Sequence, residues 1–155
     1  RTAVTLSPKS LAYQEFWSEL LGRIRTEHPS WTRSTAAPAQ SWITLPYGTS
    51  WIWYGLAFTL AGPRVELYFG GPDADANLVE FERFTAHKHL LDEEFGPAIH
   101  YDALPGKKAC RIHTDRLSGD VLDTESHEDL ITWFMSTMEK FRPVTQQVKS
   151  LLEAE

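Results

Sequence analysis

The chain has 155 residues, which fits one domain with a substantial core. Its formal net charge of −6 argues against a protein that binds the phosphate backbone of a nucleic acid with its whole surface. No stretch reaches the ~18 apolar residues of a membrane helix, so we expect no membrane contact. The single cysteine, Cys110, excludes a disulfide framework and favours a reducing, cytoplasmic compartment.

A helix is expected first. Ser7-Pro8 is a helix start, because serine caps helices and proline suits the first helical position. Apolar residues then recur at helical spacing from Tyr13 to Ile24. His28-Pro29 ends this helix, and the composition of residues 30–40 predicts a loop.

Three strand-like runs follow, over residues 42–46, 51–61 and 64–69. The middle run is apolar on both faces, which is typical of a central strand, and Trp51 and Trp53 share one of those faces. The turn at Gly62-Pro63 predicts that the second and third strands pair as a hairpin.

A second helix is predicted from Asn77 to Gly96, and two short strands over 98–103 and 108–114. A third helix begins at Ser126, and Pro143 is expected to break or kink it. The order α-βββ-α-ββ-α predicts one α+β domain over residues 1–155, with a five-stranded, mostly antiparallel sheet and helices packed on it.

Motifs for catalysis or metal binding are lacking. His87 and His89 point in different directions on a helix, and His89 with Glu93 supplies too few ligands for zinc. Glu66 is not followed two residues later by the lysine of a PD-(D/E)xK nuclease. Cys110 lies in a strand, away from any helix start that would acidify it. We therefore expect no catalytic residue, no metal and no cofactor.

Lys88 interrupts the apolar seam of the second helix. A charged side chain there either extends its stem to solvent or meets a carboxylate. Glu66 projects from a neighbouring strand, so we expect a structural Glu66–Lys88 ion pair.

A local binding face is compatible with the acidic total. The strand-rich half holds the candidates for nucleic-acid binding: for phosphates Arg64, Lys107, Lys108 and Arg111, and for stacking Trp51 and Trp53. The two tryptophans could form a shelf for a partner's side chain or a flipped base, or could lie beneath the first helix.

Several segments are similar, in order, to one known family: Phe16-Trp17, Tyr54–Phe58, Arg64–Tyr68, Asn77 with Phe81 and Lys88, Glu94–Gly96, Lys108–Ile112 and the helix around Trp133. Together they resemble the bacterial and archaeal family called domain of unknown function 4268. The resemblance implies a module that often forms the C-terminal part of longer proteins. Some of those proteins carry a restriction-endonuclease-like domain upstream, in defence against foreign DNA. It assigns no catalytic residue.

Two functions are expected on these grounds. The first is a non-catalytic accessory module of a nuclease or restriction-type defence protein, contributing DNA recognition or assembly. The alternative is a protein–protein interaction or dimerisation domain without nucleic-acid contact, and a small-molecule enzyme ranks third. The resemblance implies that the chain is the C-terminal module of a longer protein, and its start at Arg1 without a methionine agrees with that expectation. Its expected partners are DNA, an upstream nuclease domain or a second copy.

Overall fold

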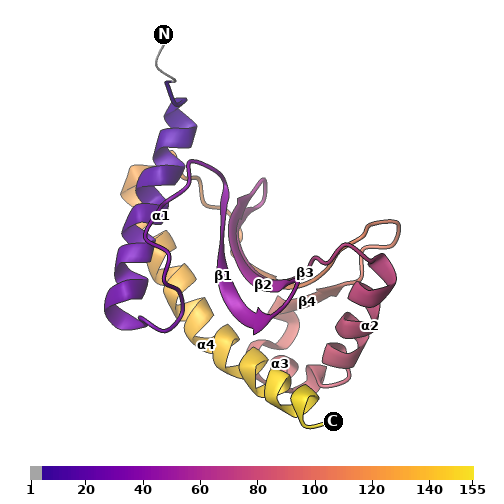
Figure 1. The fold of residues 1–155 in the computed structure, drawn as a ribbon. Helices are drawn as coiled ribbons and strands as arrows, with labels where there is room; N and C mark the ends of the chain where they lie inside the picture. Colours follow the sequence, from indigo (N-terminus) through magenta and orange to yellow (C-terminus); the bar gives the residue numbers. More distant parts are fainter. Residues whose placement is uncertain (1–4) are drawn as a thin grey trace.

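The computed structural model describes residues 5–155 and has one curved antiparallel sheet with helices on one side of it (Figure 1). The elements are α1 (Pro8–Glu27), β1 (Trp42–Thr49), β2 (Ile52–Thr59), β3 (Gly62–Phe69), α2 (Ala74–Thr85), α3 (Lys88–Phe95), the short 3-10 turn η1 (Gly96–Ala98), β4 (Ile99–Asp102), β5 (Cys110–Asp115), the 3-10 turn η2 (Thr124–Ser126) and α4 (His127–Glu153). The predicted α+β class and five-stranded sheet are confirmed.

The strands lie in the order β1-β2-β3-β5-β4, and each neighbouring pair is antiparallel. The predicted hairpin of β2 and β3 is confirmed, with Thr59 opposite Gly62 at its turn. Gly62 has a φ of +136°, and a Cβ there would collide with the carbonyl oxygen of Arg116. Only glycine therefore fits this turn.

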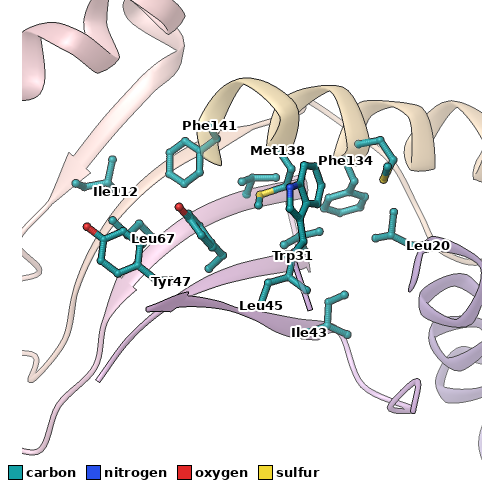
Figure 2. Packing of buried hydrophobic residues seen from close by; sticks show 14 of the residues in the cluster. Leu20, Trp31, Ile43, Leu45, Tyr47, Leu67, Ile112, Phe134, Met138 and Phe141 are labelled. Carbon is teal, nitrogen blue, oxygen red and sulfur yellow. The ribbon is translucent and has the colours of Figure 1, made fainter. Parts of the chain in front are cut away.

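The core lies between the sheet and the helices, of which α4 is the longest. Figure 2 shows Phe134, Met138 and Phe141 of α4 facing Leu45 and Leu67 of the sheet, and all five side chains are buried. Alternate positions of β1, β2 and β3 supply the sheet side of this core. None of the described helices is both long and apolar enough to cross a bilayer.

The first helix packs on the buried face through an aromatic cluster. Ser7 caps α1 by accepting a hydrogen bond from the backbone of Ser10 at 3.1 Å, as its position predicts. Phe16 and Trp17 of α1 lie 4.9 and 5.5 Å, between ring centroids, from Phe58 of β2. Phe58 is on the opposite face of β2 from Trp53. The hypothesis that the tryptophans lie beneath the first helix is therefore wrong for Trp53.

The second predicted helix is in fact two helices, because the chain turns at Ala86 and His87. The backbone amide of His87 donates to the carbonyl of Phe84 at 3.0 Å, which closes α2 tightly before α3 begins. The change of direction allows Phe84 and Leu91 both to reach the core. No glycine or proline marks this break, so the sequence pattern did not reveal it.

Of the break or kink expected at Pro143, the break is wrong, because α4 is one helix from His127 to Glu153. Proline in a helix removes one backbone hydrogen bond and crowds the preceding turn. Here the turns beyond the proline bury Val144 and Val148 against the sheet, which offsets that cost. The hydroxyl of Thr145 also donates to the carbonyl of Phe141 at 2.7 Å.

Candidate binding face of the sheet

The sheet has a second face, turned away from α4, that no helix of residues 5–155 covers (Figure 1). We call it the open face. Its side chains come from alternate positions of the strands, and strand pairing places Trp53 beside Tyr68, Gly55 beside Glu66 and Ala57 beside Arg64. On β5 the same face continues through Arg111, His113 and Asp115. It therefore gathers large rings and charged groups rather than apolar core residues.

The centre of the open face is hollowed into a groove of about 420 Å³. Its lining consists of Trp42, Thr44, Trp53, Gly55, Ala57, Thr59, Arg64, Glu66, Tyr68 and Arg111. The small residues form the floor. A Cβ on Gly55 would lie 2.9 Å from Cγ of Glu66, so glycine is what allows the glutamate to lie across the floor. This volume is within the range of small-ligand sites.

Aromatic rings bound the groove. The rings of Trp53 and Tyr68 lie 5.3 Å apart at an interplanar angle of 41°, and the guanidinium of Arg111 lies 5.6 Å from the Tyr68 ring. Trp42, on the edge strand β1, is 49% exposed. Rings that keep free faces at a groove can stack against planar ligands.

The floor also holds a carboxylate and a guanidinium that pair only loosely. Oε1 of Glu66 lies 3.7 Å from Nε of Arg111, which is beyond hydrogen-bond length. Burial raises the pKa of Glu66, although the positive charges of Arg111 and Arg64 oppose that shift. Nε of Arg111 is itself buried with no hydrogen-bond partner among the described residues. Both groups are thus desolvated without being fully satisfied.

The expected Glu66–Lys88 pair is wrong. Glu66 lies on the open face of β3 and is paired with Arg111. Lys88 begins α3, on the helical side of the sheet, where it is exposed and lies 5.8 Å from the ring of Tyr101. The sheet separates the two side chains.

A histidine between two carboxylates borders the groove. Nδ1 of His113 lies 2.7 Å from Asp115, and Nε2 lies 2.6 Å from Asp102. Nε of Arg64 donates to the other oxygen of Asp115 at 2.6 Å. Although burial raises the pKa of Asp115, the hydrogen bond from Arg64 and the charge of His113 outweigh it and lower that pKa. This network joins β3, β4 and β5 and holds Arg64 at the edge of the groove.

Sequence reasoning did not select His113, Asp102 or Asp115. A signal was present, because polar side chains alternate along β5 at Arg111, His113 and Asp115. Such alternation indicates a strand with one polar face.

The predicted basic residues fall into two neighbouring groups. Arg64 and Arg111 line the groove. Lys107 and Lys108 are exposed in the β4–β5 connection, residues 103–109, which we call the lysine loop. The lysines line a second hollow of about 390 Å³, which shares Tyr68 and Arg111 with the groove. The two hollows therefore adjoin.

The two predicted tryptophans are separated. Trp53 lines the groove, whereas Trp51 lies in the β1–β2 turn with a φ of 67° and is 59% exposed. Its side chain lies beside Gly71, outside the groove. The expected shelf of both rings on one strand does not form.

Three potential metal ligands meet on the helical side, although the sequence led us to expect no metal. One ligand atom from each of Glu27, His28 and Glu139 lies within 4.8 Å of the others. His28 already has structural contacts, with Nε2 2.7 Å from Glu139 and its ring stacked 4.0 Å from Trp31. These contacts join the end of α1 to α4 without requiring an ion.

Comparisons with known proteins agree with the resemblance. Neither the curated proteins nor the solved structures compared with this chain gave a match. One family model matches residues 12–149, which is most of the chain, and it includes every residue of the groove and the lysine loop. The chain therefore belongs to the family described as Domain of unknown function (DUF4268).

Proposed function

We propose that this domain is a non-catalytic accessory module that binds DNA through the open face, within a nuclease or restriction-type defence protein. Unpaired bases would stack against Trp53 and Trp42 in the groove. The backbone phosphates next to these bases would contact Lys107 and Lys108 of the lysine loop. The observation that supports this proposal most strongly is the groove, in which aromatic and charged side chains line one uncovered sheet face.

The distribution of charge supports the same proposal despite the acidic total. Arg64 is neutralised by Asp115, so it contributes little free charge. Lys107 and Lys108 have no ion-pair partner within 4.0 Å among residues 5–155. Lysines without an ion-pair partner beside aromatic rings suit the binding of single-stranded DNA. The lysines contact the phosphates of the backbone, and the bases stack on the rings.

A protein-interaction role is the alternative, and one observation favours it. Trp42 lies on β1, an edge strand, and exposed tryptophans are enriched at protein interfaces. Light scattering over a dilution series tests self-association through this edge. A dimer that disappears in Trp42→Ala would support the alternative.

Binding of a labelled oligo(dT) to the purified chain, measured by fluorescence anisotropy over a salt series, tests the DNA proposal. Replacing Lys107 and Lys108 by alanine should weaken binding and flatten the plot of log K against log salt by about one to two units. The matched control replaces Lys9 and Arg33, two exposed cations that line neither the groove nor the second hollow, and should leave both quantities unchanged. An unchanged slope in the loop variant would contradict the proposal.

A further inference from the structure

We infer that Glu66 and Arg111 make the groove selective for guanine. The inference rests on the proposed function and adds which base the open face prefers. It begins from the loosely paired carboxylate and guanidinium on the groove floor, which no other feature of the described fold explains.

These two groups are positioned for a ligand. The Glu66 side chain is only 14% exposed, yet its carboxylate accepts no hydrogen bond from residues 5–155. Nε of Arg111 is buried and also lacks a hydrogen bond there. Poorly hydrated polar groups of this kind destabilise a fold unless a partner satisfies them. A planar ligand that donates to the Glu66 carboxylate and accepts from the part of the Arg111 guanidinium that faces the groove would supply that partner.

Guanine matches this pair better than the other bases. Its N1–H and N2–H donors lie side by side, next to the O6 acceptor. A carboxylate accepts two parallel hydrogen bonds, and arginine donates readily to O6. Adenine and cytosine present a single amino group beside an acceptor, and thymine presents one donor between two acceptors. None of these three can donate twice to Glu66.

The rings beside the pair fit the same ligand. Tyr68 lies two residues after the glutamate on β3, its register partner Trp53 lies beside it on β2, and Trp42 lies on the far side of the small floor residues. A purine stacked on Trp53 would place its hydrogen-bonding edge toward β3, where Glu66 projects. Gly55 keeps the floor low enough for this approach.

The test compares an oligo(dT) nonamer with three nonamers that carry one central dG, dA or dC, with affinity measured by anisotropy. We expect the dG oligomer to bind the wild-type chain about tenfold or more tightly than the others, as one bidentate base contact provides. Glu66→Gln should lose this preference and shift toward dA, because an amide pairs with adenine. Glu94→Gln, an exposed glutamate on α3, is the matched control and should behave as wild type.

The outcomes separate the inference from the proposed function. Equal affinity for all four oligomers, or a dG preference that survives in Glu66→Gln, overturns the inference and leaves DNA binding intact. If no oligomer binds, the DNA-binding proposal is wrong. A titration with free guanosine monophosphate then tests whether the groove recognises guanine. Binding of that nucleotide that weakens in Glu66→Gln supports guanine recognition by the groove, and absence of such binding overturns it.

Discussion

Phe58 is a sheet side chain that contacts three aromatic residues of α1, so Phe58→Ala tests the packing of the fold. Its ring lies 5.7 Å from Tyr13, 4.9 Å from Phe16 and 5.5 Å from Trp17 of α1, and 5.7 Å from Phe134 of α4. It is only 8% exposed. Alanine would remove the entire ring and leave a cavity between three elements, which can close only if α1 moves.

The expected cost follows from this burial. Truncating a buried phenylalanine costs about 3–5 kcal/mol, and we expect a cost in this range because four neighbouring rings lose their contact with Phe58. In a domain of this size 1 kcal/mol corresponds to roughly 2–4 °C, so the melting temperature should fall by about 6–20 °C. Urea unfolding followed by circular dichroism gives the free energy of unfolding, and a thermal scan gives the shift.

Leu60→Ala is the matched control. Leu60 lies two residues further along the same chain, at the β2–β3 turn, and is fully exposed. Its truncation should change the free energy of unfolding by no more than about 0.5 kcal/mol. A cost below about 1 kcal/mol for Phe58→Ala would refute the packing of α1 on this face.

Three further predictions concern buried polar groups. Tyr54→Phe removes a hydroxyl that lies 2.6 Å from the hydroxyl of Thr145. Thr145 still donates to the carbonyl of Phe141 in its own helix, so the free energy of unfolding in urea should fall by only about 1 kcal/mol. The pKa of Asp115 is lowered from 3.8, so its carboxylate stabilises the fold above that value. The difference in the free energy of unfolding between the wild type and Asp115→Asn should therefore become smaller as the pH falls below about 4. The pKa of Glu66 is raised from 4.5, so its ionisation costs stability as the pH rises. Glu66→Gln should melt at a higher temperature than wild type at pH 7, but not below pH 4.5.

The sequence predicted those parts of the fold that depend on local pattern. Ser7-Pro8 marks the start of α1, and the turn at Gly62-Pro63 correctly predicts the hairpin of β2 and β3. The break at His87 and the continuity of α4 through Pro143 were missed. Both depend on what the helix packs against, and burial in the core overrode the local signal at each site.

The site was harder to predict than the fold. Its residues lie on different strands, and the order of those strands in the sheet brings them together. β5 lies next to β3 although helices and β4 separate them in the sequence, and this pairing gives Glu66 its partner Arg111. The expected pair with Lys88 put Glu66 on the helical side, and the sequence could not supply its actual neighbour on the other face. Trp51 was predicted to continue β2, whereas the β1–β2 turn takes it out of the strand.

The central claim is that unpaired bases stack in the groove, and two tryptophan variants test it most directly. Titration of an oligo(dT) into the double variant Trp42→Ala, Trp53→Ala should show affinity reduced about tenfold or more, since stacking contributes ~1–3 kcal/mol per base. Trp51→Ala removes an equally large exposed ring outside the groove and should bind as the wild type does. An equal loss in both variants, or a double variant that binds as tightly as the wild type, would contradict the claim.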